Sequence, residues 1–129
     1  MRFDKFTIKS QELIQNGQTL ASRHHHQQLE PIHLLSAMLT EKESVARSMF
    51  RKIGISPEAL VGEIAAALEK LPQVSGISEV YLSPNTKTVL ETAFEEAGHM
   101  KDEYVSIEHI LLALNDSRTG EAAAILNRH

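Results

Sequence analysis

The feature that most constrains this chain is an internal repeat with an offset of 76 positions. The sequence LEPIHLLSAML occupies Leu29–Leu39, and VSIEHILLALN occupies Val105–Asn115. The same register continues without a gap when Phe6–Ile53 is placed on Leu82–His129. A repeat of this length predicts two copies of one helical unit.

The evidence for the repeat is the coincidence of helix starts and apolar stripes. Few aligned residues are identical, and any two amphipathic helices can be matched to some degree. Three helix starts nevertheless align in order, and apolar residues recur at equivalent positions with helical spacing. The aligned starts are Thr7 with Ser83, Glu30 with Ser106, and Ser44 with Gly120. We therefore favour a true repeat over a chance match.

Local signals divide the first copy into three helices. Thr7 is predicted to cap a helix that runs to about Arg23, because its hydroxyl can accept from an unpaired backbone N–H. Pro31 is favoured at the first position of a second helix, and the mostly apolar residues after it place that helix centrally. Ser44 predicts the start of a third helix, and Gly54 predicts its end.

An extra helix is predicted over residues 56–71, where Ser56–Pro57–Glu58 gives a strong start and Pro72 a stop. Residues 73–82 have no helical period and predict a linker, and Ser83–Pro84 starts the second copy. The predicted fold class is all-α. We expect one domain over 1–129, with repeats at about 6–53 and 82–129 and the extra helix and linker within 54–81. Two such copies commonly pack about a pseudo-twofold axis, which would leave a groove where they meet.

Composition excludes several classes of site. The net charge is −4 with no basic patch, which argues against a nucleic-acid partner. The absence of cysteine excludes disulfides, a thiolate nucleophile and a cysteine metal site. No apolar run approaches the roughly 18 residues of a membrane span, and the N-terminal MRFDKFT lacks the apolar core of a signal peptide. We therefore expect a cytoplasmic protein with no membrane partner.

Four separated motifs carry a family resemblance. They are MRFDKFT at the N-terminus, LEPIHLLSAML, LPQVSG at 71–76, and VSIEHILLAL at 105–114. Together they resemble the Clp N-terminal repeat domain, and LPQVSG and EPIHLLSAML resemble its ClpB branch, the bacterial protein disaggregases. The resemblance covers essentially the whole chain. The ATPase modules of that branch are absent, as is any G-x-x-x-x-G-K-[ST] phosphate loop. Because the chain ends where the second copy ends, we expect it to be a domain cut out of a longer protein.

The resemblance implies a non-catalytic substrate-recognition module. In the family, such a module binds unfolded or aggregated polypeptide through an apolar groove between the repeats and helps load it into the pore of a hexameric ATPase ring. It cooperates with the DnaK chaperone system and needs no cofactor or metal of its own, since ATP and Mg belong to the absent modules. In other branches the same fold docks adaptor proteins, which is the alternative function.

The resemblance also suggests site residues. Polar contacts with substrate are expected at Thr7, Asp102 and Glu108. Each has a simpler explanation: Thr7 caps a helix, Glu108 offsets a helix dipole, and Asp102 is a turn residue.

Apolar contacts are expected from residues that the helical stripes do not place in the core. Phe6, Leu90 and Tyr104 are the main candidates, with Phe3 and the segment Val80–Leu82 beside them. The simpler explanations are that Phe6 staples the helix it precedes and that Leu90 is ordinary core.

Seven histidines raise the question of a metal site. His33 and His109 are equivalent in the two copies, and each is expected to be packed and hydrogen-bonded to a nearby carbonyl. The run His24–His26 is expected in a solvated loop, because consecutive side chains diverge rather than converge on an ion. We expect no physiological metal site, and the role of this run stays open.

Two other functional classes compete with a substrate-binding module. An enzyme is disfavoured because no Ser/His/Asp or paired-carboxylate motif is recognisable in the sequence. A nucleic-acid-binding helix-turn-helix would suit short helices, but not an acidic chain with scattered Lys and Arg.

Overall fold

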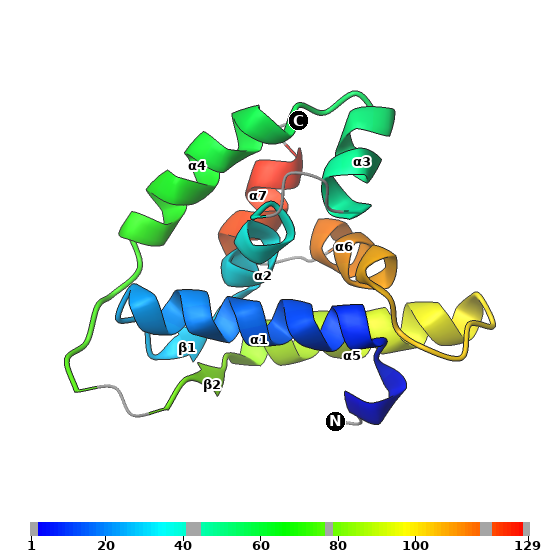
Figure 1. Ribbon diagram of the computed structural model, residues 1–129, viewed down its shortest axis with the longest axis horizontal. Helices are drawn as coiled ribbons and strands as arrows, with labels where there is room; N and C mark the ends of the chain where they lie inside the picture. Colours follow the sequence, from blue (N-terminus) through cyan, green and yellow to red (C-terminus); the bar gives the residue numbers. More distant parts are fainter. Residues whose placement is uncertain (1–2, 41–44, 77–78, 117–119, 128–129) are drawn as a thin grey trace.

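The computed structural model describes residues 3–40, 45–76, 79–116 and 120–127, and helices account for most of them (Figure 1). The helices are α1 (Ile8–Arg23), α2 (Pro31–Met38), α3 (Val45–Lys52), α4 (Pro57–Glu69), α5 (Pro84–His99), α6 (Ile107–Asp116) and α7 (Gly120–Asn127), preceded by the 3-10 turn η1 (Phe3–Lys5). Two short strands, β1 (Gln28–Leu29) and β2 (Tyr81–Leu82), pair in parallel. The predicted all-α class of two helical repeats with an extra helix is confirmed.

The predicted helix starts lie where local chemistry places them. The hydroxyls of Thr7 and Ser83 accept hydrogen bonds from the backbone N–H groups of Ser10 and Thr86, each in the first turn of the helix it caps. After α3 the chain turns through Gly54 with a φ of +85°, a conformation that glycine adopts without strain. The predicted cap Ser44 lies outside the described residues.

One predicted cap works differently. Ser56 does precede α4, but its hydroxyl bonds the Glu58 carboxylate rather than a backbone N–H. The pKa of Glu58 is lowered by its backbone hydrogen bond, with the Ser56 hydroxyl, Arg51 and Arg47 contributing less. The helix starts as predicted, but this side chain supports a neighbouring carboxylate instead of closing the first turn.

Each copy of the repeat is bound at the start of its first helix to the other copy. Ser10 Oγ donates to the carbonyl of Val105 over 2.9 Å, and the N–H of Thr7 bonds the same oxygen. At the equivalent positions, Thr86 Oγ1 donates to the carbonyl of Leu29 over 2.6 Å. The N–H of Ser83 donates a second hydrogen bond to the Leu29 carbonyl oxygen. These reciprocal bonds give the two copies their pseudo-twofold arrangement.

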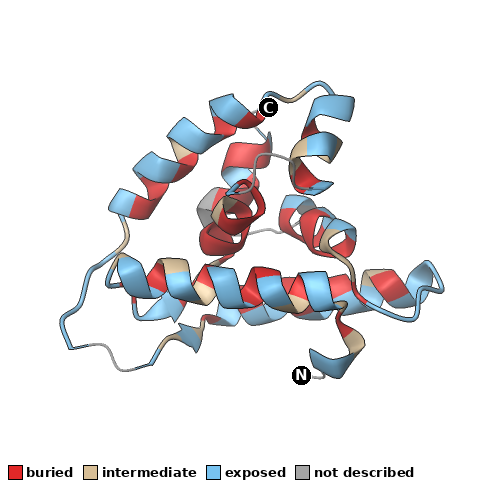
Figure 2. Ribbon diagram, in the orientation of Figure 1, coloured by how far each residue is buried: buried red, intermediate tan, exposed pale blue. Residues whose placement is uncertain are grey.

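The core lies between the copies, around the central helices α2 and α6. Figure 2 shows α2 buried on nearly all sides, whereas the outer helices are buried on one face only. Leu34, Leu35 and Leu114 are among the fully buried side chains. Gly17 allows α1 to approach this core closely, because a Cβ there would lie 3.0 Å from Leu29 Cδ1.

The extra helix α4 has no counterpart in the second copy. It packs across α2 and α7 through Leu60, Ile64 and Leu68, which are buried (Figures 1 and 2). The segment after it was predicted to be a linker, because it has no helical period. At its end Tyr81–Leu82 forms β2 against β1, a pairing that was not predicted. The pairing depends on the contact between copies, which local sequence does not encode.

The buried hydroxyl of Thr86 bonds the other copy, so it should stabilise the fold more than an exposed hydroxyl on the same helix. Thr86→Val removes the hydrogen bond to Leu29 and should lower the free energy of unfolding by about 1–3 kcal/mol. Thr88→Val is the matched control, because Thr88 is exposed and bonds only within its own helix. Urea unfolding of both variants measures the difference, and equal midpoints would contradict a stabilising role for the bond between copies.

Candidate functional site

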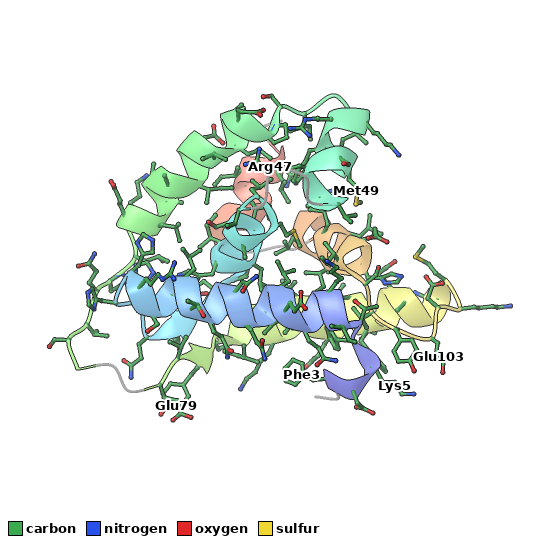
Figure 3. All side chains as sticks on the ribbon, viewed as in Figure 1. Phe3, Lys5, Arg47, Met49, Glu79 and Glu103 are labelled. Atoms are coloured by element: carbon green, nitrogen blue, oxygen red, sulfur yellow. The ribbon has the colours of Figure 1, made fainter. Side chains whose placement is uncertain are left out.

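A small apolar groove lies where the two copies meet. Phe3 of η1 and Ile14 of α1 line it on one side, and Leu82 of β2 lines it on the other. Its volume is about 290 Å³, and Gln11, Gln15 and Gln18 complete its wall. Phe3 is 38% exposed, so an apolar ring stays open to solvent at this groove. Figure 3 labels Phe3 just below α1. Phe3 and Leu82 were among the apolar residues named from the sequence.

Four of the predicted site residues gather near the turn before α6. The N–H of Thr7 bonds the carbonyl of Val105, directly after the half-exposed Tyr104. Asp102 lies in the same turn, and Glu108 is exposed in the first turn of α6. Figure 3 labels Lys5 and Glu103 in this region of the surface. The backbone bond thus brings Thr7, which follows η1, to the segment that holds the other three residues.

Two predicted apolar contacts are not at the surface. Phe6 is 2% exposed and Leu90 is 0% exposed, so both belong to the core between the copies. Phe6 is buried because its backbone pairs with Val105, and Leu90 because it lies on the inner face of α5. We revise the site accordingly: in this conformation neither side chain offers surface to a bound polypeptide.

A chain of hydrogen bonds joins His26 and His33 of the first copy. The N–H of Glu30 donates to His33 Nδ1 over 2.8 Å, which leaves the proton of the neutral ring on Nε2. His33 Nε2 lies 2.9 Å from His26 Nδ1 and can donate to it. The expectation that His33 bonds a carbonyl is therefore wrong, since its partners are a backbone N–H and a second imidazole.

Burial disfavours the charged forms of these two rings. Burial lowers the pKa of His33 to about 4, and the neighbouring His26 and His24 add to the shift. Burial also lowers the pKa of His26, with contributions from His24 and His25 in the same direction. His26 is 3% exposed, so the prediction that the whole run lies in a solvated loop is wrong for this residue.

The reason for the burial of His26 is the turn at the preceding residue. His25 adopts a φ of 59°, and this left-handed conformation turns the chain after α1. His26 Nε2 makes no hydrogen bond within the described residues. The nearby backbone of Leu68 opposes the lowering of the His26 pKa, but its effect is smaller than that of burial.

The second copy repeats this network with a carboxylate in place of one ring. The N–H of Ser106 donates to His109 Nδ1 over 2.9 Å, and His109 Nε2 lies 2.9 Å from Asp102 Oδ2. Asp102 is equivalent to His26 in the repeat, and Lys101 has the same φ of 59° as His25. The expectation that His109 bonds a carbonyl is therefore also wrong.

Ser106, His109 and Asp102 form a hydrogen-bonded chain that the sequence analysis did not foresee. Ser106 Oγ lies 3.0 Å from His109 Nδ1, so the three residue types of a hydrolase triad are in contact. The backbone N–H of Ser106 bonds the same nitrogen, however. In the first copy Glu30 replaces the serine and the same histidine contact persists. The feature common to both copies is closure of the first helical turn, which accounts for the arrangement without a reaction.

Within the described ranges, no group of three or more His, Asp or Glu side chains could hold a metal ion. In the same part of the chain, no helix is both long enough and apolar enough to cross a membrane.

The glutamines of the groove were not predicted from the sequence. Gln11, Gln15 and Gln18 recur at spacings of four and three residues, which places them on one face of α1. That periodicity was visible in the sequence, but nothing in it showed that β2 would lie opposite.

The buried imidazole pair makes acid stability a test of this geometry. Because the folded pKa of His33 lies below the ordinary 6.5, the unfolded chain binds more protons between pH 6.5 and about 4. The free energy of unfolding should be constant above pH 6.5 and fall by on the order of 3 kcal/mol as the pH drops to 4. His33→Gln should lose most of this slope, since glutamine can keep the contact with the Glu30 N–H.

His99→Gln is the matched control for this titration, because His99 is exposed and lies at the far end of α5. It should keep the pH dependence of the wild type. Urea midpoints measured at several pH values give the slopes. A wild-type curve that stays flat from pH 6.5 to 4 would show that the pair is not buried as a neutral unit.

Comparison with known proteins identifies the fold and the family. Residues 5–129 match the family described as the Clp repeat N-terminal domain. The chain is 43% identical over 126 residues to the chaperone protein ClpB of Porphyromonas gingivalis, which covers 98% of this chain and 14% of that protein. ClpB of Bacteroides thetaiotaomicron is 40% identical over 114 residues, covering 88% and 13%.

Solved structures agree with this assignment. The N-terminal domain of Hsp104 from Candida albicans superposes with a TM-score of 0.85 at 25% identity, covering 96% of this chain and 81% of that one. The N-domain of ClpV from Vibrio cholerae shares the fold, with a TM-score of 0.81 at 16% identity and coverage of 98% and 77%. The chain spans about 14% of the length of the curated ClpB relatives. This chain therefore belongs to the Clp repeat N-terminal domain family.

Proposed function

We propose that the chain is a non-catalytic recognition module of a ClpB-type disaggregase, which binds unfolded or aggregated polypeptide through the groove between its repeats. The observation that carries this proposal is an open apolar groove, built from both copies, with the ring of Phe3 partly exposed in it. An exposed aromatic ring beside buried aliphatic side chains suits a ligand whose apolar residues are themselves exposed.

The size of the groove suits weak and unselective binding. A volume of about 290 Å³ lies at the lower end of ligand pockets, so it accommodates a few side chains rather than a folded surface. Burial of apolar surface has no directional requirement, so many sequences can satisfy it. A module that captures a client and then passes it on needs this combination of low selectivity and easy release.

The polar residues near the turn before α6 form the second part of the proposed site. Thr7, Asp102, Tyr104 and Glu108 would contact the client outside the groove, since the bond from the Thr7 N–H to the Val105 carbonyl brings Thr7 to the segment that holds the other three. Thr7 and Asp102 already have structural partners in Ser10 and His109. A client that contacts Thr7 or Asp102 therefore has to share the side-chain oxygen that already bonds Ser10 or His109.

The module would act as part of a larger machine. By family membership we propose that its full-length chain forms a hexameric ATPase ring, that the ring supplies ATP hydrolysis, and that the DnaK chaperone system delivers clients to it. The module itself would hold client and carry out no reaction. Ser106→Ala tests this last point, since any turnover of a small ester that the variant abolishes would assign a reaction to the Ser106–His109–Asp102 chain.

An adaptor protein is the alternative ligand. One chain that matches this fold at a TM-score of 0.81 is described as "Peptide from EAEC T6SS Sci1 SciI protein", which points to peptide partners of related domains. A peptide from an adaptor could occupy the same groove as an unfolded client. Competition separates the two: an adaptor that displaces client from the isolated domain shares the groove, and one that binds together with client uses another surface.

The groove can be tested by NMR titration of the domain with an unfolded apolar polypeptide. We expect shifts to cluster around Phe3, Ile14 and Leu82, and to extend to Thr7 and Glu108. Phe3→Ala should weaken binding about tenfold, because it removes an aromatic ring that client would bury. Ile53→Ala is the control, since Ile53 is 68% exposed and lies away from the groove.

The result can contradict the proposal in two ways. Shifts scattered over the surface, or equal affinities for the Phe3→Ala and Ile53→Ala variants, would mean that the groove does not hold client. Absence of shifts at high client concentration would mean that the isolated domain does not bind polypeptide at all, and an adaptor would become the better candidate.

A further inference from the structure

The apolar groove continues along α1 as a longer polar track. A second hollow, of about 670 Å³, shares Gln15 and Gln18 with it and extends to Ser22 and Arg23 near the end of α1. Glu79 and Val80, which precede β2, line its other side. Figure 3 labels Phe3 and Glu79 at the two ends of this track, both below α1. The two hollows together form one track between α1 and the segment 79–82.

The α1 side of the track is a row of amide groups. Gln11, Gln15 and Gln18 lie along one helix face, and within the described residues neither the Gln15 nor the Gln18 side chain has a hydrogen-bond partner. The charged side chains in the two hollows are Arg23 and Glu79, which have opposite signs. A neutral row of groups that both donate and accept hydrogen bonds is poorly suited to binding charges, and well suited to binding other amides.

The first member of this row already binds main chain. Gln11 Nε2 donates to the carbonyl of Phe6 over 2.9 Å and to the carbonyl of Phe3 over 3.2 Å. Both acceptors belong to the chain's own N-terminal segment, which enters the track at this point. The same contact made by Gln15 and Gln18 would extend it to a second polypeptide lying beyond Phe3.

The length of the row agrees with a short extended chain. Gln11 and Gln15 are four residues apart and rise about 6 Å along the helix, whereas Gln15 and Gln18 are three residues apart and rise about 4.5 Å. Main-chain amides on one edge of an extended chain repeat every two residues, or about 6.6 Å, so the long side chains of Gln15 and Gln18 have to spread apart to reach successive amides. From Gln11 to Ser22 the helix rises about 16 Å, which matches roughly five extended residues.

We propose that the glutamines of α1 bind the main chain of an extended client, whose apolar side chains enter the groove beside Phe3. This inference rests on the proposed function and specifies its ligand: an extended stretch of polypeptide, bound through its amides and therefore largely without regard to sequence. A helical client has its amides satisfied internally and cannot make these contacts.

The test compares a peptide with its ester analogue. The probe is an unstructured peptide of about twelve residues with alternating apolar and neutral polar side chains, long enough to cover the track. In the analogue, alternate main-chain amides are replaced by esters, which removes N–H donors and keeps every side chain. Wild-type domain should bind the analogue about three- to tenfold more weakly, as expected for the loss of one or two hydrogen bonds.

The double variant Gln15→Ala, Gln18→Ala should weaken binding of the amide peptide by a similar factor. It should also no longer distinguish the amide from the ester, a result that a general loss of folding would not give. Gln15→Ala alone, at an exposed position, should show part of both effects. Asn16→Ala is the matched control, because it removes an exposed amide from a neighbouring face of α1 that does not line the track.

The outcomes separate this inference from the proposed function. Equal binding of amide and ester, or unchanged discrimination by the double variant, overturns the inference. If Phe3→Ala still weakens binding in that case, the apolar groove stands as the client site. If neither probe binds the wild-type domain, both the inference and the proposed function are wrong.

Discussion

The arrangement of the two copies depends on a pair of backbone carbonyls. The oxygen of Val105 accepts from Ser10 and Thr7 of the first copy, and the oxygen of Leu29 accepts from Thr86 and Ser83 of the second. Each carbonyl immediately precedes the central helix of its own copy, so the bonds fix where the other copy's first helix begins. They also hold β2 beside β1, and β2 supplies one wall of the groove. Both carbonyls belong to buried residues and take both of their donors from the other copy, so they stay satisfied inside the core only while the copies are packed together.

Much of the fold could be predicted because its signals are local. The caps Thr7 and Ser83 and the prolines Pro31 and Pro84 act within a single helical turn, and the structure has helices beginning at each. The repeat register added what local signals lack, because it predicted that α2 and α6 would be equivalent and central. The end of α4 was less well predicted: it stops at Glu69, two residues earlier than its apolar pattern suggested.

The parts that sequence reasoning missed depend on contacts between distant segments. His26 follows two other polar residues and gives no apolar signal, yet the turn at His25 places its ring against His33. The position of Phe6 just before a helix suggested an exposed side chain. Its backbone pairs with Val105, however, and the side chain is buried in the core. One signal was available and not used. His26 and Asp102 occupy the same repeat position, each seven residues before a histidine, so the register alone could have predicted equivalent partners for His33 and His109.

The symmetry of the backbone does not extend to the groove. The repeat positions equivalent to Gln11, Gln15 and Gln18 hold Lys87, Glu91 and Phe94, so the second copy has two charges and an aromatic ring in place of the row of amides. The apolar wall is also lost there, because Phe3 is replaced by Glu79 and Leu82 by the buried Phe6. A site formed by backbone symmetry alone would occur twice. Here the side chains restrict the proposed site to α1, so the domain offers one such track and not two.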